Sequence, residues 1–351
     1  MKSSFIIAAA SSGSGKTTLS LGFMRALHRR GKVVSPFKCG PDYIDTQYHT
    51  LACGRESVNL DLYFSGGEHV KRLYSHYSAD ADVAVVEGAM GMLDGYCKHK
   101  GSAADVARTL GLPVVLLVNA ASASYSVAAT IWGFTHFMPE VRVVGVIFNR
   151  VASASHFSFL RDACADAGVE CLGWLPRRAT LKVPSRHLGL SLTALDEISG
   201  FIDAAADAAE ESVDVDRLLE LTREGERESM ASPFWALERS EWQRIAVAHD
   251  EAFNFLYRAN LDSLRMQGHQ VLEFSPLHDQ EMPSADILYL PGGYPELFAE
   301  ELSANRGMRE SVKSFIEGGG KAWAECGGMI YLGEEIDGVP LVGALPLRTT
   351  M

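Results

Sequence analysis

The chain has 351 residues, of which 47% are hydrophobic and 22% are charged, a globular composition that excludes disordered and fibrous proteins. The formal net charge of −12 argues against a protein that binds nucleic acid, because such proteins concentrate positive charge. No apolar segment approaches the roughly 20 residues of a membrane span, so we expect no membrane partner either. At about 150 residues per domain, the length predicts two domains.

The cysteines and the N-terminus both favour a cytoplasmic location. The six cysteines include no C-x-x-C pair, which fits a reducing compartment. The apolar run at residues 5–10 is shorter than the roughly 7–15 residues of a signal-peptide core. We therefore expect a cytoplasmic protein.

Short apolar runs alternate with longer amphipathic segments from the N-terminus onward. This alternation is typical of a parallel β-sheet with helices on both faces. Residues 17–30 and 103–110 have the pattern of helices, and the whole region predicts an α/β domain over residues 1–190. The candidate strands of this domain are residues 5–9, 33–38, 83–87, 114–118, 143–148 and 171–175.

The composition changes after this domain. Between Asp196 and Met230, twelve acids and three bases account for −9 of the net charge of −12. Apolar residues recur there at helical spacing, and a run of charge is usually a solvated face. We interpret residues 191–240 as an acidic helical segment followed by a linker.

A second alternation of strands and helices follows the linker. It predicts a second open α/β domain over residues 241–351, and its length of about 110 residues leads us to expect an incomplete one. The candidate strands are residues 245–248, 271–274, 287–290 and 322–324. The candidate helices are residues 252–266 and 308–317.

A phosphate-binding loop joins the first predicted strand to the first predicted helix. Residues 10–18 match the pattern G-x-x-x-x-G-K-[ST] except at the first position, where Ala10 replaces Gly. Glycines let the backbone N–H groups surround phosphate oxygens at the helix N-terminus. The motif therefore predicts a nucleotide site in which Lys16 reaches the β- and γ-phosphates and Thr17 holds Mg²⁺. The other nucleotide contacts that we expect are Gly13, Ser14, Gly15 and Thr18.

Acidic side chains follow the second and third predicted strands. Asp42 and Asp45 come after the second strand, and Glu87 ends the third. Open α/β sheets bind ligands at the edge where strands end, so we expect these acids beside the phosphate loop. There they can orient a phosphoryl acceptor, and Asp45 and Glu87 can complete the Mg²⁺ shell with Thr17. Asn149 follows a later strand as an adenine contact or as a simple turn residue.

A cysteine in the second domain stands where a nucleophile would be exposed. Cys326 lies between the strand at residues 322–324 and a glycine-rich turn, the arrangement of a nucleophile elbow. A helix N-terminus at that point favours the thiolate. We expect the N–H groups of Gly293 and Gly327 to form an oxyanion hole. The alternative is a buried structural cysteine, which is the commoner role of a free cysteine.

Taken together, these motifs resemble the cobyrinic acid a,c-diamide synthase family. The resemblance covers essentially the whole chain, in order. It rests on the phosphate loop and on residues 38–45, 87–94, 186–190, 250–255, 290–296 and 325–328. Enzymes of that family join a P-loop domain like that of dethiobiotin synthetase to a class I glutamine amidotransferase domain, and we expect the same α/β architecture here.

The resemblance implies an ATP-dependent carbon–nitrogen ligase of cobalamin biosynthesis. ATP and Mg²⁺ would convert the a- and c-acetate carboxylates of cobyrinic acid to acyl phosphates, which ammonia then attacks. The ammonia would be free or released from glutamine. In matching positions, Asp42, Asp45 and Glu87 would serve metal binding and carboxylate activation, and Cys326 would be the glutaminase nucleophile.

Two departures from the family pattern affect these expectations. Asn119 stands where many relatives carry Asp, and we expect this to leave ATP use intact. The chain stops at Met351, before the histidine-rich motif that holds the family's base, so we expect ammonia to be used better than glutamine. We also expect apolar surface around residues 342–347 to be uncovered, which favours association of chains as a homodimer.

Other functions fit parts of the same pattern. Hydrogenobyrinic acid or a nickel-sirohydrochlorin could replace cobyrinic acid as the substrate, and the motifs alone do not separate them. A partitioning-type P-loop ATPase is an alternative from another class, although its usual extra lysine is absent and Ser11 and Ser12 stand in this part of the loop. A catalytically inactive binding module is the third alternative.

Overall fold

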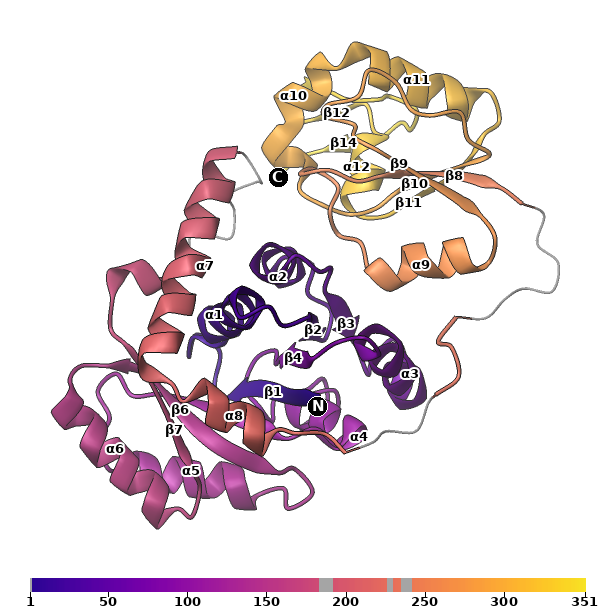
Figure 1. Cartoon of the computed structure of the whole chain (residues 1–351). Helices are drawn as coiled ribbons and strands as arrows, with labels where there is room; N and C mark the ends of the chain where they lie inside the picture. The colour runs from indigo at the N-terminus through magenta and orange to yellow at the C-terminus, as the bar shows by residue number, and fades with distance from the viewer. Residues whose placement is uncertain (1, 183–191, 226–229, 235–241) are drawn as a thin grey trace. The chain divides into compact units, whose positions relative to one another are not determined.

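The computed structural model describes residues 2–182, 192–225, 230–234 and 242–351 (Figure 1). These residues form two compact units. The first unit holds the described residues up to 182 and from 195 to 233, and the second holds those from 234 onward. The motif at residues 186–190 lies outside the described residues.

The first unit is built around a seven-stranded sheet in which every neighbouring pair is parallel. The strand order is β3-β2-β4-β1-β5-β6-β7, so the carboxyl ends of all seven strands lie at one edge. Every residue of β1 and β4 is buried, as expected for strands covered on both faces. The strands are β1 (Ser3–Ala9), β2 (Val34–Cys39), β3 (Val58–Leu60), β4 (Val83–Glu87), β5 (Val114–Asn119), β6 (Val143–Val151) and β7 (Cys171–Pro176).

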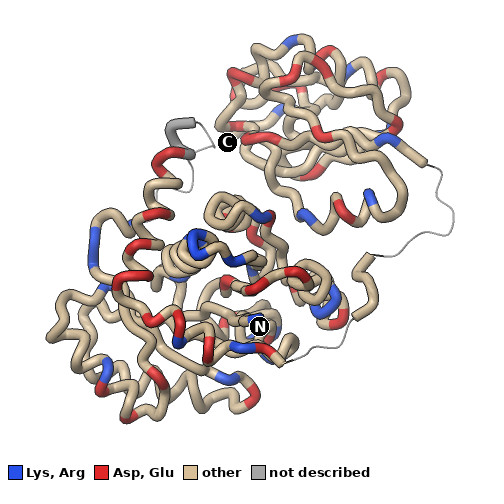
Figure 2. Tube along the Cα trace, viewed as in Figure 1, with Lys and Arg blue, Asp and Glu red and all other residues tan. Residues whose placement is uncertain are grey.

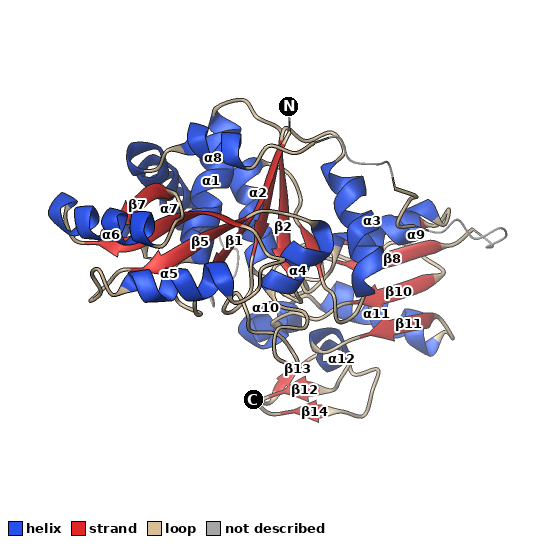
Figure 3. Ribbon diagram, turned by 90° about the horizontal axis from the view of Figure 1, so that it is seen from below, coloured by secondary structure: helices blue, strands red, loops and turns tan. Residues whose placement is uncertain are grey.

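Helices cover both faces of this sheet. Figures 1 and 3 show α1, α2 and α7 on one face and α4 and α5 on the other. A large apolar core joins the first of these faces to the sheet. The helices are α1 (Lys16–Arg29), α2 (Asp45–Cys53), α3 (Gly66–Ser78), α4 (Ala103–Leu110), α5 (Val127–His136), α6 (Ala154–Asp166), the 3₁₀ turn η1 (Ala179–Leu181), α7 (Leu192–Ser212) and α8 (Val215–Leu221).

The acidic segment forms α7 and α8, and apolar residues of both helices, such as Ile198, Ile202 and Leu218, are buried in the core of the first unit. Figure 2 shows acidic residues along α7. Several of them pair with arginines at the end of α1 or directly after it: Asp203 lies 2.9 Å from Arg29, and Glu210 lies 3.1 Å from Arg30. The run of acids is therefore partly neutralised by α1, and the segment is more than a solvated face.

The second unit contains a four-stranded parallel sheet of order β11-β10-β8-β9 and a small three-stranded sheet. The larger sheet is made of β8 (Arg244–Ala248), β9 (Gln270–Phe274), β10 (Ile287–Leu290) and β11 (Lys321–Ala324). The small sheet is made of β12 (Glu335–Ile336), β13 (Val339–Pro340) and β14 (Arg348–Thr349). The helices are α9 (Arg258–Met266), η2 (Pro295–Phe298), α10 (Ala299–Ala304), α11 (Arg306–Glu317) and α12 (Gly327–Tyr331).

The predicted α/β fold with parallel sheets is confirmed, and the structure differs from the expectations in three local details. The helix expected from residue 252 begins only at Arg258, because the Asp250 carboxylate accepts hydrogen bonds from the N–H groups of Ala252 and Phe253 and holds a turn there. The three-residue strand β3 was not predicted. Of the apolar surface expected at residues 342–347, Val342 is buried in the core of the second unit, whereas Leu345 is 37% exposed.

Within the described ranges, no helix combines the length and the apolar character that crossing a bilayer requires.

Candidate active site

The phosphate loop connects β1 to α1 with a backbone that only glycine adopts easily. Gly13 and Gly15 have φ angles of +71° and +102°. A Cβ on Gly15 would lie 2.1 Å from Nδ2 of Asn149, so a larger residue cannot occupy this position without moving Asn149. The buried Ser14 donates a hydrogen bond to the carbonyl of Ser11 over 2.9 Å. Lys16 and Thr17 then become the first residues of α1.

Two side chains at the end of β6 hold this loop. Nδ2 of Asn149 donates to the carbonyl of Ser14 over 2.8 Å, and Nη2 of Arg150 donates to the carbonyl of Gly13 over 3.1 Å. Oδ1 of Asn149 accepts from the N–H of Arg150 over 2.8 Å. Both ends of the Asn149 amide are therefore engaged within the protein. Because an amide has two N–H donors and an oxygen with two lone pairs, these bonds are compatible with an adenine contact as well.

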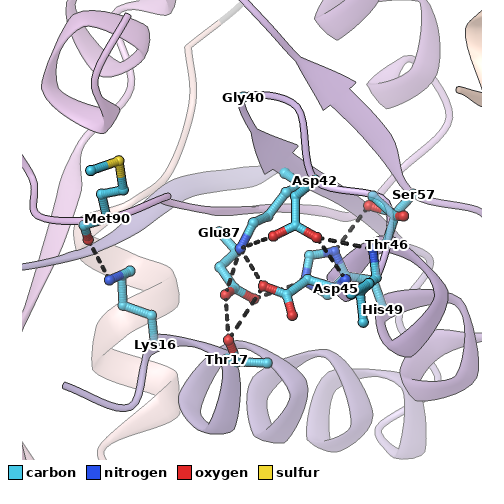
Figure 4. A network of polar contacts seen from close by, with 12 residues as sticks. Lys16, Thr17, Gly40, Asp42, Asp45, Thr46, His49, Ser57, Glu87 and Met90 are labelled. Carbon is cyan, nitrogen blue, oxygen red and sulfur yellow. Dashed lines mark hydrogen bonds and ion pairs between the residues drawn. The ribbon is translucent and has the colours of Figure 1, made fainter. Parts of the chain in front are cut away.

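Lys16 is buried beside the loop, and its ammonium group is held by carbonyl oxygens. Nζ donates to the carbonyl of Met90 and, over 3.4 Å, to that of Ser11 (Figure 4). Burial lowers the pKa of Lys16. A phosphate oxygen carries a full charge and would be a stronger acceptor than either carbonyl. The Lys16 ammonium group can therefore exchange its carbonyl partners for the phosphate of a bound nucleotide.

Beneath the loop, Thr17 contacts two buried carboxylates that come from different strands. Its hydroxyl lies 2.7 Å from Oε1 of Glu87, at the end of β4, and 3.5 Å from Oδ2 of Asp45, at the start of α2. Among the residues that the structure describes, no group of three or more His, Cys, Asp or Glu side chains could hold a metal ion. Mg²⁺ usually takes one or two carboxylates and completes its shell with phosphate and water oxygens, so these three oxygen donors fit it.

Lys38, to which the sequence analysis assigned no role, lies at the centre of this cluster. Its Nζ donates to Oδ2 of Asp45 and, over 2.9 Å, to Oε1 of Glu87, and it lies 3.6 Å from Oδ2 of Asp42. Burial alone would lower the pKa of Lys38, but the negative charges of Glu87 and Asp45 hold it above its ordinary value. A lysine at the end of the otherwise buried β2 was the available signal.

His49 is a second residue that sequence reasoning missed. It lies one helical turn after Asp45 on α2 and is fully buried. Nε2 lies 2.8 Å from Oε2 of Glu87, and Nδ1 lies 2.9 Å from the hydroxyl of Ser57. The i,i+4 spacing from Asp45 was a usable signal, because it places both side chains on one helix face.

The pKa values of the two buried carboxylates, Asp45 and Glu87, are shifted in opposite directions. Burial and, second, the negative charge of Glu87 raise the pKa of Asp45 to about 6. Burial alone would also raise the pKa of Glu87, but Lys38 and His49 hold it below its ordinary value. Glu87 is therefore a permanent anion near neutral pH, whereas Asp45 can bind or release a proton there.

Asp42 lies at the rim of the same cluster and organises the start of α2. Its Oδ1 accepts from the N–H groups of Ile44 and Asp45 over 3.0 and 2.9 Å. Nδ2 of Asn59 donates to the carbonyls of Gly40 and Asp42, which fixes the loop from the neighbouring strand. One oxygen of Asp42 therefore accepts from N–H groups at the start of the helix, while the other lies 3.6 Å from Nζ of Lys38.

A cavity of about 940 Å³ opens above these residues. Its lining comes entirely from the first unit and includes the basic side chains of Arg150, Arg177, Arg178 and Lys182. Nine of the expected site residues also line it: Gly13, Gly15, Lys16, Thr17, Thr18, Asp42, Asp45, Glu87 and Asn149. Sequence reasoning thus brought together residues that share one cavity.

The second unit holds Cys326 in a sharp turn between β11 and α12. Its backbone has φ 47° and ψ −114°, a conformation rare for a residue with a side chain, and the residue is exposed. A Cβ on Gly327 would lie 2.7 Å from Cδ of Pro295, and one on Gly293 would lie 1.9 Å from the carbonyl of Ala252. Glycine at both positions lets the two loops touch beside the thiol.

Two histidines of the second unit are paired with carboxylates. Nδ1 of His249 lies 2.8 Å from Oε2 of Glu273, and Nε2 of His278 lies 2.9 Å from Oε2 of Glu251. Next to Cys326, Glu325 accepts from the indole N–H of Trp323 over 2.8 Å. The exposed thiol, the strained turn and the adjoining glycine loop are the features that this unit offers for chemistry.

Comparison with known proteins gives matches to both units. Residues 5–190 match the family described as the CobQ/CobB/MinD/ParA nucleotide binding domain, and residues 244–351 match the CobB/CobQ-like glutamine amidotransferase domain. The cobyrinate a,c-diamide synthase of Listeria innocua is 42% identical over 337 residues, which are 95% of this chain and 75% of that protein.

Two other relatives match to a similar extent. The cobyrinate a,c-diamide synthase of Picrophilus torridus is 43% identical over 336 residues, covering 95% of this chain and 76% of that protein. The hydrogenobyrinate a,c-diamide synthase of Brucella ovis is 44% identical over 357 aligned positions, covering 99% of this chain and 81% of that protein. Each match extends through the nucleotide-binding and amidotransferase regions together.

Proposed function

Because this chain belongs to the family of cobyrinate and hydrogenobyrinate a,c-diamide synthases, we propose that it amidates the a- and c-acetate carboxylates of cobyrinic acid. ATP supplies the driving force, and glutamine or ammonia supplies the nitrogen. The observation that carries this proposal is the buried cluster of Thr17, Lys38, Asp45 and Glu87 directly under the phosphate loop. It concentrates the charges that carboxylate activation by phosphoryl transfer requires.

The substrate carboxylate must first be activated, because its oxygen is a poor leaving group whereas phosphate is a good one. A carboxylate oxygen of the substrate attacks the γ-phosphorus of ATP, ADP leaves, and an acyl phosphate forms. Ammonia then attacks the acyl carbon and phosphate departs, which leaves the amide. In this sequence the loop amides and Lys16 bind and orient the phosphates, and their positive charge stabilises the transferring group.

The acids below the loop complete the phosphoryl-transfer site. Thr17, Asp45 and Glu87 would hold Mg²⁺, which would neutralise charge on the phosphates when bound. Lys38 keeps Glu87 and Asp45 together in a buried position. Asp42 orients the start of the helix that carries Asp45, because its carboxylate accepts a hydrogen bond from the N–H of Asp45.

The second unit would supply ammonia. In this proposal the Cys326 thiolate attacks the side-chain amide carbon of glutamine, ammonia leaves, and water hydrolyses the resulting thioester to glutamate. The N–H groups of Gly293 and Gly327 would stabilise the oxyanion of each tetrahedral intermediate. The contact between their loops supports this assignment, because it brings both glycines next to the thiol.

The identity of the acceptor is best decided by experiment. Relatives named for cobyrinate and for hydrogenobyrinate are equally similar to this chain, so hydrogenobyrinic acid is the second candidate substrate. A partitioning ATPase is disfavoured by the amidotransferase domain at residues 244–351. We also place the enzyme in the cytoplasm, because its six cysteines are free thiols of the kind that a reducing compartment maintains.

The test is an amidation assay on the purified chain. Cobyrinic acid and hydrogenobyrinic acid are each incubated with ATP, Mg²⁺ and either ammonium or glutamine, while ADP is measured and products are analysed by mass spectrometry. We expect monoamide and diamide products together with ADP formation that depends on the corrinoid. Nucleotide hydrolysis that ignores both acids, with no amide formed, would contradict the proposal.

A further inference from the structure

The order of strands divides the ligand-binding edge of the first unit into two sides. The phosphate loop follows β1, and the residues that hold it lie near the end of β6, on one side of the edge. The acids of the phosphoryl-transfer cluster follow β2 and β4, and β3 lies beyond β2 at the end of the sheet. An acceptor carboxylate that approaches the acids therefore has the loops after β2, β3 and β4 as its natural surroundings.

Those loops carry a cluster of exposed aromatic side chains. Tyr63 and Phe64 follow β3, and Tyr96 follows β4, with exposed fractions of 63%, 71% and 61%. The ring centroid of Tyr63 lies 5.1 Å from that of Phe64 and 4.9 Å from that of Tyr96. The ring of Tyr63 thus contacts both of the others, and three large rings joined in this way that still face solvent are unusual, because isolated apolar residues are the norm on protein surfaces. We call Tyr63, Phe64 and Tyr96 the aromatic cluster.

The backbone beneath the aromatic cluster is fixed by hydrogen bonds. The buried Asp61 accepts from the N–H groups of Tyr63 and Phe64 over 2.8 and 3.2 Å. The N–H of Tyr96 donates to the carbonyl of Lys100 over 3.0 Å, and a Cβ on Gly101 would lie 2.7 Å from the Tyr96 ring. The rings are therefore presented on an ordered backbone, which lowers the entropic cost of binding a ligand.

A basic hairpin adjoins the aromatic cluster. Tyr96 is continuous with a turn in which the N–H of Gly95 donates to the carbonyl of Lys98 over 2.7 Å. The tip of this turn carries Lys98, His99 and Lys100, and both lysines are exposed. We call residues 95–100 the basic hairpin. Its positive charge stands out in a chain whose net charge is −12.

The same loop links this surface to the site of phosphoryl transfer. It starts directly after Glu87, and its residue Met90 lines the cavity and accepts the hydrogen bond from Lys16. A ligand seated on the aromatic cluster would thus be held by the segment that also contacts the phosphate-binding lysine. An acceptor docked there can present a carboxylate to the acids while the rest of the molecule stays outside the cavity.

We propose that the aromatic cluster and the basic hairpin form the docking surface for the tetrapyrrole-derived macrocycle of the acceptor. This inference rests on the proposed function. A corrinoid acid is a broad, largely apolar ring bordered by carboxylates, so aromatic faces and peripheral cations match both parts of its chemistry. The surface determines which molecule is amidated, and the phosphate loop and acids carry out the reaction.

The experiment compares substrate affinity and nucleotide affinity in the same enzyme. Tyr63→Ala, Tyr96→Ala and their double variant are assayed with ammonium, ATP and cobyrinic acid. We expect the KM for cobyrinic acid to rise by about tenfold in each single variant and further in the double variant, since a lost aromatic contact commonly costs this much. The KM for ATP should stay unchanged. Phe137→Ala, which removes an equally exposed ring (72%) after α5, is the matched control.

A charge-reversal pair tests the basic hairpin separately. In Lys98→Glu combined with Lys100→Glu, we expect a higher KM for cobyrinic acid and a weaker dependence of that KM on salt. Lys71→Glu, at a half-exposed lysine on α3, is the control. Thermal unfolding of every variant should match that of the wild type, because the altered side chains are exposed.

Direct binding separates this inference from the proposed function. Equilibrium binding of cobyrinic acid and of hydrogenobyrinic acid is measured without ATP, so it does not depend on turnover. If the wild type binds either acid and the cluster variants do not, the docking surface stands even where amidation fails. Unchanged corrinoid affinity in the variants would overturn it. A change of oligomeric state with unchanged affinity would also overturn it, because the surface would then join two copies of the chain.

Discussion

The two candidate sites of this chain depend on different structural features, buried side-chain charges in one and backbone conformation in the other. In the first unit, the candidate site consists of side-chain charges that are buried and mutually neutralised, with Lys38 between Glu87 and Asp45. In the second unit, the candidate site consists of an exposed thiol on a strained turn between glycine loops. From this difference we expect the activity of the first site to depend on side-chain charge and pH. We expect the activity of the second site to depend on the sulfur atom of Cys326 and on the absence of a Cβ at its glycines.

The largest expected effect is the loss of the phosphate-binding charge. Lys16→Ala should remove most ATP-dependent amidation, by a factor on the order of 10³, because a positioned charge on a phosphoryl transition state contributes several kcal/mol. Steady-state rates with ammonium at saturating ATP measure this. Lys32→Ala, at an exposed lysine just after α1, is the control and should behave like the wild type. Near-normal turnover by Lys16→Ala would refute the phosphate-loop assignment.

The next effect separates the two units. Cys326→Ser should abolish glutamine-dependent amidation and leave ammonium-dependent amidation almost unchanged, because the thiol serves only to release ammonia. Gly327→Ala keeps the thiol but brings a Cβ to 2.7 Å from Pro295, so it should impair glutamine use in the same selective way. Both variants are assayed with each nitrogen donor. Equal loss with the two donors would show that the elbow supports the whole fold rather than one half-reaction.

A smaller effect concerns the stability of the first unit. Glu87→Gln removes the carboxylate that Lys38 and His49 share, although Lys38 keeps its pair with Asp45, and breaking a buried pair costs up to about 3–5 kcal/mol. We therefore expect lower activity together with a clearly lower Tm. Glu68→Gln, at an exposed glutamate of α3, should change neither. Normal stability with lost activity would mean that Glu87 acts on ligands alone, and that water or a counterion replaces its charge in the folded protein.

The parts of this comparison that sequence could predict are those with local signals. The phosphate loop, the acids at strand ends and the cysteine turn each have a fixed spacing along the chain, and the parallel sheets followed from apolar runs. Lys38 and His49 had only weak local signals, because the contacts that make them part of the site come from strands and helices that meet only in the folded unit. The same holds for the aromatic cluster, which joins residues after β3 to one after β4.

The role given to Asn149 shows a further limit. Its place after β6 was compatible with an adenine contact or a turn, and the structure shows both amide atoms engaged with the loop and with Arg150. No pattern in one sequence tells which neighbour an amide will face. Similarly, the acidic run before residue 230 reads as solvated from composition alone, although α1 supplies arginines that pair with it.

The smallest effect is a pH dependence confined to the first unit. Because the pKa of Asp45 is raised to about 6, its carboxylate is mostly charged only above that pH. Binding of ATP with Mg²⁺ should therefore weaken as pH falls below about 6, by up to about tenfold per pH unit, if one proton must leave. Calorimetric titration with a non-hydrolysable ATP analogue, from about pH 5 to about pH 7.5, measures how the affinity depends on pH. Asp45→Asn should flatten this dependence.

Protonation of Asp45 should weaken nucleotide binding but stabilise the folded state. The assignment of Asp45 as the titrating group can therefore be tested in a second experiment. An unfolded Asp has a pKa of about 3.9, so between that value and about 6 the folded chain holds a proton that the unfolded chain has lost. Stability must therefore fall as pH rises through this window, and Asp45→Asn should remove that part of the fall. Denaturant unfolding at several pH values measures it. If the variant and the wild type show the same slopes in both experiments, another group titrates, and Asp45 is not the proton-binding acid of the cluster.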